Sequence, residues 1–212
     1  MIYFGLSGIE SSSKKPGLQA MESKSKGDLW KLSFLFSMDA FGGGFVTQSL
    51  LSYWFYFTYH VSLKLLGPIF MVVNIITAVS IIASGYIAHR VGNLRTMFYS
   101  HLLSNVFLIM IPLSGFLSGA LAFLFLRQSV SQMDVPARQA LMADLFSSDD
   151  RVSAVAITNT ARTISALPGS PITGALLAAG LVTVPIVIGG ASKIVYDFSI
   201  FGAYRKRVRR GL

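Results

Sequence analysis

The sequence predicts an all-α membrane protein with six transmembrane helices, and two observations lead to this fold class. Hydrophobic residues make up 53% of the chain and charged residues only 13%, whereas soluble domains carry roughly 25% charged residues. Glycine, proline or charged residues also divide the chain into six apolar segments, several of which reach the roughly 20 residues that a helix needs to cross a bilayer. These segments lie at about 29–60, 66–88, 94–113, 117–133, 152–180 and 182–203.

Polar segments flank this apolar region at both ends. Residues 1–27 are mostly polar and rich in serine and lysine, which predicts a cytoplasmic tail or linker. Residues 205–212 are strongly basic and predict a second short cytoplasmic tail. We therefore expect one six-helix membrane domain over residues 28–204.

The distribution of lysine and arginine predicts which side of the membrane each loop faces. An even number of helices places both termini on one side, and cytoplasmic loops carry an excess of lysine and arginine. With both termini cytoplasmic, the outer loops hold only Lys64. The inner segments hold fourteen of the eighteen basic residues: Lys14, Lys15, Lys24, Lys26, Lys31, Arg90, Arg95, Arg138, Arg151, Arg205, Lys206, Arg207, Arg209 and Arg210. This pattern fits a plasma membrane and an inner membrane equally well.

The same composition argues against several other classes of protein. The chain has no cysteine, so it has no disulfide framework. Its net charge of +9 does not indicate nucleic-acid binding, because the basic residues lie at the ends of apolar segments. Intramembrane serine proteases need a glycine-flanked serine and a histidine base, and we place the three histidines, His60, His89 and His101, at or near helix ends. We expect no enzyme, no metal site and no cofactor.

The segment 134–150 is the longest and most charged inner connection. Asp134 and Arg138 are expected at the water boundary, and Pro136 disfavours helical backbone at the preceding residue. The segment therefore predicts a helix exit, a surface segment and a helix entry, and a plain solvated loop is the simpler alternative. The N-cap of the next helix is expected at one of three residues: Ser148, Asp149 or Asp150.

Two inner connections resemble sequence patterns of the major facilitator superfamily. After the fourth helix of a six-helix half, that pattern has a proline, an alanine-rich amphipathic segment, an aspartate and an arginine that opens the fifth helix. This sequence matches it at Pro136, Arg138, Ala140, Asp144 and Arg151, directly after Asp134.

The second resemblance lies between the second and third helices, in "GYIAHRVGNLR". Gly85, Arg90 and Gly92 match the short cytoplasmic loop signature of the superfamily. His89 stands at its acidic position and Asn93 at its first basic position, so the match is partial. We expect the glycines to permit close helix approach and a sharp turn, and the arginine to hold the loop against neighbouring helix ends.

Together with "DAFGGGFVTQSLLSYWF" and "GGASKIVYD", these motifs are similar to the carboxyl-terminal six-helix half of a twelve-helix permease, over about residues 29–204. The resemblance implies secondary active transport of a small solute across the lipid bilayer by alternating access. It also implies a second six-helix half, supplied by another copy or by a separate chain. The alternative is a non-transporting, truncated or regulatory membrane protein that pairs with a full-length transporter.

Ionisable residues within the spans are the first candidates for a substrate site, because such groups are costly in the membrane. Asp39 lies about ten residues into its helix, roughly 15 Å along the helix axis and near mid-depth. It could bind a proton or a cation, or form a structural ion pair with a basic residue of another helix. Lys193 and Asp197, four residues apart, are expected to neutralise each other.

Arg162 lies near the centre of a proline-interrupted segment, before Pro168. Transporters place ligand contacts at such interrupted helices, so Arg162 could bind substrate. The alternative is a kinked helix whose polar groups bond to neighbouring helices. Three neutral residues complete the predicted substrate-binding set: Gln48, Asn74 and Asn159.

Overall fold

The computed structural model describes residues 23–209 of the chain. The described residues form nine α-helices and no strand. Residues 1–22 of the predicted tail (1–27) and the last three residues of the chain lie outside this part. The helices are α1 (Ser23–Gly44), α2 (Gln48–Tyr59), α3 (Leu63–Val91), α4 (Asn93–Leu113), α5 (Leu117–Ser131), α6 (Asp134–Leu145), α7 (Ser148–Ala166), α8 (Gly169–Ala178) and α9 (Val184–Arg209).

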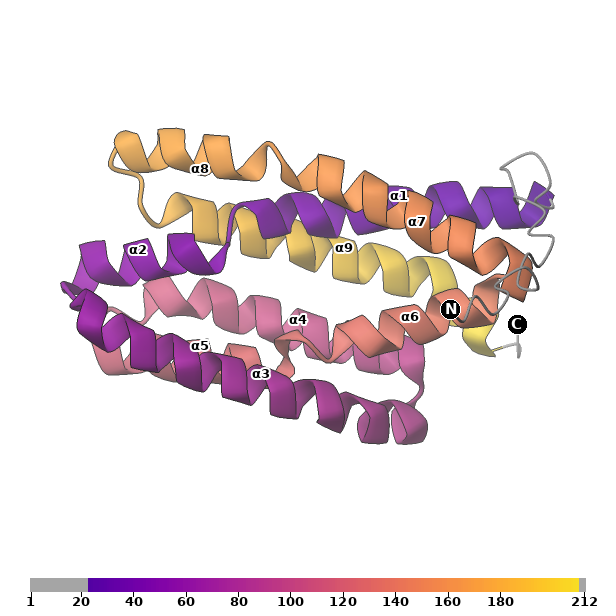
Figure 1. The fold of residues 1–212 in the computed structure, drawn as a ribbon, viewed down its shortest axis with the longest axis horizontal. Coiled ribbons are helices and arrows are strands. Elements are labelled where there is room, and N and C mark those ends of the chain that lie inside the picture. The colour runs from indigo at the N-terminus through magenta and orange to yellow at the C-terminus, as the bar shows by residue number, and fades with distance from the viewer. Residues whose placement is uncertain (1–22, 210–212) are drawn as a thin grey trace, which may run out of the picture.

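These helices make six passes along the molecule, and the predicted all-α fold is confirmed (Figure 1). Three passes are the continuous helices α3, α4 and α9, which are long and apolar enough to cross a membrane. The other three are each broken once, into α1 and α2, α5 and α6, and α7 and α8. A broken pass leaves backbone groups without intrahelical partners, so it is a place where a membrane helix can offer polar contacts.

Local sequence explains two of the breaks. In the first pass α1 ends in three consecutive glycines, and α2 restarts at Thr47, whose hydroxyl oxygen accepts a hydrogen bond from the backbone N–H of Leu50 at 3.3 Å. In the fifth pass Pro168 has no N–H to donate to the preceding turn, so α7 ends just before it.

The segment 134–150 differs from the expected surface segment. Residues Asp134–Leu145 form α6, which continues the fourth pass, and two residues then join it to α7. Proline is tolerated at the third position of a helix, because the first-turn N–H groups have no partner there in any case. The apolar face of α6 packs into the core, and Asp134 is only 4% exposed. Asp134 and Arg138 therefore do not lie at a water boundary, and that prediction was wrong.

The N-cap of α7 is Ser147, one residue before the expected positions. Its hydroxyl oxygen accepts a hydrogen bond from the backbone N–H of Asp150 at 3.4 Å. Asp149 and Asp150 then fall in the first turn, where acidic side chains favour the positive end of the helix dipole. At the two ends of the chain, α1 begins at Ser23, inside the predicted linker, and α9 extends to Arg209, into the predicted basic tail.

The six passes form two groups of three, visible as the upper and lower parts of Figure 1. One group contains α1, α7, α8 and α9, and the other contains α3, α4, α5 and α6. The groups meet where α4 packs against α9. The contacts in the two halves of the chain correspond. The first pass packs against the fifth (α1 and α7), just as the fourth packs against the second (α5 and α3). The third pass packs against the fourth (α4 and α5), just as the sixth packs against the first (α9 and α1). Such a correspondence of contacts is the pattern that an internal repeat of three passes produces.

Two hydrophobic clusters form the interior. One surrounds Leu32, Met97 and Ile200, toward the end at which α1 begins. The other surrounds Phe55 and Leu108, toward the opposite end. In α1, α4 and α9 the residues between the two clusters include buried polar and charged side chains. The candidate site lies in this middle layer.

Candidate functional site

Asp39 is the centre of a buried group of charges. Its side chain is 4% exposed, and its Oδ1 accepts a hydrogen bond of 2.7 Å from Nζ of Lys193 in α9. Its Oδ2 lies 3.3 Å from Nη1 of Arg162 in α7 and 3.7 Å from Nη1 of Arg138 in α6. Three helices thus supply a cation to one carboxylate of α1, which offsets part of the cost of burying it.

His101 of α4 joins Asp39 to a second carboxylate. Its Nε2 lies 3.3 Å from Oδ1 of Asp39, and its Nδ1 lies 2.6 Å from Oδ1 of Asp197 in α9. The other oxygen of Asp197 accepts a hydrogen bond of 2.9 Å from the amide nitrogen of Asn105. A protonated imidazole can donate to both carboxylates at once, whereas a neutral one can donate to only one.

Arg138 links the group to a third carboxylate. It forms an ion pair with Asp134, four residues earlier on α6, and its guanidinium lies 5.4 Å from the ring centre of Phe36. We name the whole group the Asp39 cluster. It consists of seven side chains from five passes: Asp39, His101, Asp134, Arg138, Arg162, Lys193 and Asp197.

The charges of the Asp39 cluster nearly cancel. Three aspartates oppose two arginines and one lysine, so the state of His101 decides whether the net charge is zero or +1. Isolated charges in the interior of a membrane domain are costly, so a nearly neutral cluster is what permits so many ionisable groups there.

Arg162 is the most exposed member of the cluster. Its side chain is 25% exposed, against 13% for Arg138 and 14% for Lys193. Its Nη1 is buried and has no hydrogen-bond partner among the described residues, although it lies within ion-pair distance of Asp39. The guanidinium therefore has unused hydrogen-bonding capacity and reaches the outer face of the bundle.

The structure divides the five predicted substrate residues among three places. Asp39 and Arg162 lie together in the Asp39 cluster. Gln48 and Asn74 line an open groove of about 580 Å³ between α2 and α3, together with aliphatic side chains and Phe70. Asn159 is exposed on α7, one turn before Arg162.

Lys193 and Asp197 were expected to neutralise each other, but in the structure each pairs with a different residue. Lys193 pairs with Asp39, and Asp197 pairs with His101. An i, i+4 pair on one helix is worth only about 0.3–0.5 kcal/mol, so buried partners on neighbouring helices take precedence. Both side chains thus tie α9 to other passes.

The predicted loop motifs mark the end of the bundle at which α3 meets α4. Gly92 has a φ of +92°, which glycine adopts without strain, and it forms the turn as expected. A Cβ placed on Gly85 would have no heavy atom within 4 Å, so this glycine mediates no close helix approach. Arg90 is exposed and forms no ion pair with a described residue, whereas the Asn93 amide donates to a carboxylate oxygen of Asp144 at 3.5 Å.

Arg151 and Asp144 act at the junction of α6 and α7. The guanidinium of Arg151 donates a 3.0 Å hydrogen bond to the backbone carbonyl of Ala143, in the last turn of α6. It therefore satisfies a carbonyl that has no intrahelical partner. Asp144, next to that carbonyl, accepts the bond from Asn93 described above.

Sequence reasoning missed His101 because it placed that residue near a helix end. In the structure His101 lies well inside α4 and is 5% exposed. A signal was present in the sequence: His101 and Asn105 are four residues apart, and Ser104 lies beside them in a largely apolar helix. Polar residues repeated at this spacing indicate a helix face that contacts other polar groups.

Comparison with known proteins gives two matches. A family model described as Major Facilitator Superfamily matches residues 2–170. The chain is also 28% identical over 170 residues to the uncharacterized membrane protein YJR124C of Saccharomyces cerevisiae. That alignment covers 80% of this chain and 38% of the relative, so the chain spans well under half of the relative's length.

Proposed function

This chain belongs to the major facilitator superfamily, and we propose that it carries a small solute across a membrane by alternating access, as one half of a permease. The family itself implies transmembrane transport of a solute. The finer proposal concerns the solute site, the second half and the role of the Asp39 cluster. Both termini are proposed to be cytoplasmic, as the lysine and arginine distribution predicts.

The observation that carries the proposal is the position of Arg162. It is a charged side chain near the middle of a broken pass, paired with Asp39 at 3.3 Å and one quarter exposed. Partial exposure leaves part of the guanidinium facing the space that a second half would enclose.

The open groove beside α2 and α3 supports the same arrangement. Gln48 and Asn74 are exposed on its walls, and two of the chain's helices bound it. Solute sites in transporters are enclosed at the interface of two repeats or bundles. A second six-helix half would supply the opposite wall and would cover the polar side chains on this face.

The chemistry of Arg162 favours an anionic solute. A guanidinium binds carboxylate or phosphate oxygens through two parallel hydrogen bonds. Arg162 can contact an incoming anion while it stays paired with Asp39, or it can leave Asp39 to bind the anion. In the second case the Asp39 carboxylate keeps its contacts with Lys193 and His101. The proposed site therefore binds a small carboxylate or phosphate compound.

Ligand binding tests this proposal directly. We expect members of a panel of small carboxylates and phosphates to raise the unfolding temperature of the detergent-solubilised protein, and neutral sugars to leave it unchanged. Arg162→Gln should remove the effect, while the exposed Arg90→Gln should retain it. Equal stabilisation of both variants by the same anion would exclude Arg162 from the solute site.

The pairing of halves needs a separate measurement. Light scattering on a sizing column should show a dimer, or a complex with a co-expressed second half. A stable monomer that nevertheless transports a bound anion in proteoliposomes would refute the half-permease arrangement.

A further inference from the structure

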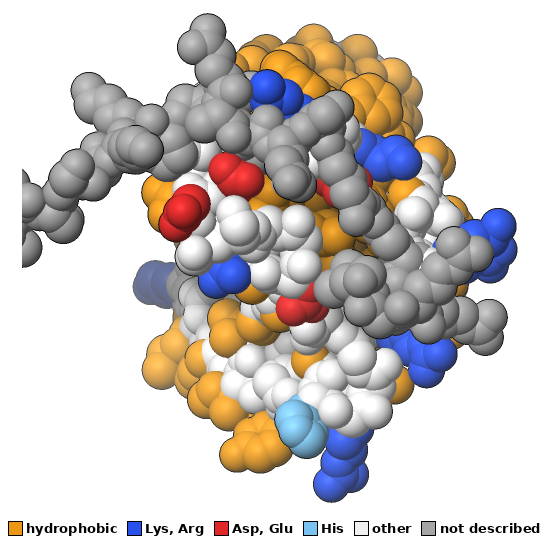
Figure 2. Space-filling view, turned by 90° about the vertical axis from the view of Figure 1, so that its right-hand side faces the viewer, with side chains coloured by type: hydrophobic (Ala, Val, Ile, Leu, Met, Phe, Trp, Pro, Cys, Tyr) orange, Lys and Arg blue, Asp and Glu red, His pale blue; other side chains and the backbone are white. Residues whose placement is uncertain are grey.

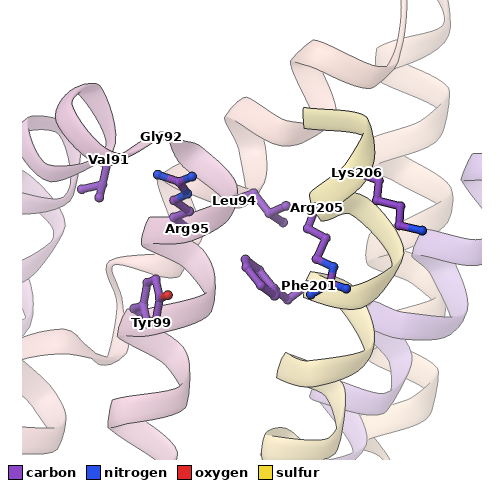
Figure 3. Close-up of a pocket in the computed structure, with 8 residues that line it drawn as sticks. All are labelled: Val91, Gly92, Leu94, Arg95, Tyr99, Phe201, Arg205 and Lys206. Carbon is purple, nitrogen blue, oxygen red and sulfur yellow. The ribbon is translucent and has the colours of Figure 1, made fainter. Parts of the chain in front are cut away.

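A second pocket lies outside the Asp39 cluster, at the end of the bundle where α3 turns into α4. Its volume is about 660 Å³, and it lies between the first turns of α4 and the last turns of α9 (Figure 3). Three cationic side chains line it: Arg95, Arg205 and Lys206. Independently of the proposed transport function, we infer that this pocket binds the phosphate headgroup of an anionic phospholipid.

The three cations are available to a ligand. All three are exposed, and none of them forms an ion pair or hydrogen bond with another described residue. The lining contains no acidic residue among those described. Asp144, the acid that contacts this turn, bonds to Asn93, which is not part of the lining. The pocket thus concentrates unpaired positive charge, which attracts anions.

The first turn of α4 adds to this field. Its N-cap is Gly92, which has no side chain to accept a bond from the free N–H groups, and no acidic residue occupies the first turn. Such a helix start carries partial positive charge and unsatisfied donors. Gly92, Leu94 and Arg95 all line the pocket, so these backbone groups lie beside the cationic side chains.

The rest of the lining is mostly apolar, which distinguishes this pocket from a site for a free anion. Figure 3 shows Leu94 extending from α4 toward α9 and Phe201 extending from α9 toward α4, while Arg205 lies along α9. The ring of Phe201 stacks on Phe98 of α4 with centroids 4.3 Å apart. A phosphate bound here would therefore have hydrocarbon-like surface directly beneath it.

That apolar surface continues along both helices toward the middle of the bundle. On α4, Tyr99, Leu103 and Val106 are exposed at helical spacing on one side. On α9, Val187, Val195 and Phe198 are exposed in the same way. Because α4 packs against α9 and Phe198 contacts Phe98 of α4 with ring centroids 5.6 Å apart, these exposed apolar side chains can accommodate an acyl chain below the headgroup.

The position of the pocket fits the polar boundary of a bilayer. Lysine and arginine side chains lie mostly around the edge of this end of the molecule, and hydrophobic side chains cover the flanks behind them (Figure 2). Basic pockets between transmembrane helices bind anionic lipid headgroups, and tyrosine is enriched at the same depth. Lipid, rather than a soluble anion, is therefore the proposed occupant.

The test compares lipids on the purified protein. After delipidation in a neutral detergent, phosphatidylserine is expected to raise the unfolding temperature more than phosphatidylcholine does. The triple variant Arg95→Gln, Arg205→Gln, Lys206→Gln should lose this difference. A charge-matched control, Lys31→Gln, Lys64→Gln, Arg90→Gln, removes three exposed cations outside the pocket and should retain it.

Binding of phosphatidylserine, measured by native mass spectrometry, should weaken roughly fivefold for each pocket cation removed. The single variants provide this measurement even if the triple variant does not fold. Equal loss in the charge-matched control would overturn the inference, because the effect would then be general electrostatic attraction. Stabilisation by inorganic phosphate to the same extent as by phosphatidylserine would overturn the assignment to lipid.

Discussion

Nζ of Lys193 lies 2.7 Å from Oδ1 of Asp39, so the first and last passes of the bundle are joined by a buried ion pair. The two residues are 154 positions apart in the sequence. The pair holds α9 against α1 near the crossing where Gly42 meets the backbone of Gly189. It therefore connects the centre of the Asp39 cluster to the packing of the helices.

We expect Lys193→Ala to destabilise the protein by about 3 kcal/mol, near the lower end of the range for removing one partner of a buried pair. The lower end applies because Asp39 keeps its contacts with His101 and Arg162. Unfolding of the detergent-solubilised protein by increasing SDS would measure this loss. The exposed Lys64→Ala is the control and should change stability by less than about 0.5 kcal/mol. Equal stability of the two variants would show that the pair contributes nothing to folding.

The breaks in the first and fifth passes pack directly against each other. A Cβ on Gly169 would overlap the backbone of Gly44, and the hydroxyl of Ser170 donates a 3.4 Å hydrogen bond to the Gly44 carbonyl. We expect Gly169→Ala to cost about 1–3 kcal/mol through overpacking. Gly174→Ala, on the same helix, has open space around its Cβ position and should cost nothing.

The same SDS unfolding measurement applies to this pair of variants. If Gly169→Ala were as stable as Gly174→Ala, the two breaks would be free to separate, and the close contact would have no role in stability.

Hydropathy predicted the six passes because a bilayer forces every spanning segment to be apolar and internally hydrogen-bonded. It did not predict the role of α6. Its polar residues indicate water when read locally, but Asp134 and Arg138 instead pair with each other beside Asp39. A sequence shows that a charge is present and not whether water or another helix neutralises it.

The candidate site was predictable to a similar degree. Asp39 and Arg162 were identified because ionisable groups in a span are costly. Their partners Lys193 and His101 depend on which helices lie side by side, and this is a property of the tertiary fold. The spacing of residues along one helix predicted instead that Lys193 pairs with Asp197, because such spacing identifies only neighbours on the same helix.

The topology makes a third prediction. Ser148 and Ser118 are exposed at opposite ends of the bundle, the first where α7 begins and the second where α5 begins. With both termini cytoplasmic, Ser118→Cys should react with an impermeant thiol reagent in intact cells, and Ser148→Cys should react only after the membrane is opened. The chain has no cysteine of its own, so no background labelling arises. The reverse pattern would invert the orientation.

The last prediction separates the two roles of Arg162 that its geometry permits. In proteoliposomes that contain this half and its partner half, we expect Arg162→Ala to abolish or redirect transport while leaving insertion and pairing intact. If Arg162 served only to neutralise Asp39, then Arg162→Ala combined with Asp39→Asn should recover much of the activity, because one cation and one carboxylate are removed together and the charge sum of the cluster is unchanged. If Arg162 binds the solute, the double variant should stay inactive, since a two-pronged contact to an anion is lost in both variants.

The remaining cations, Lys193 and His101, stay within reach of residue 39 in either case. We expect the inactive double variant, because Arg162 is the one cation of the cluster with a quarter of its side chain exposed, and wild-type transport by the single variant would remove it from the solute site.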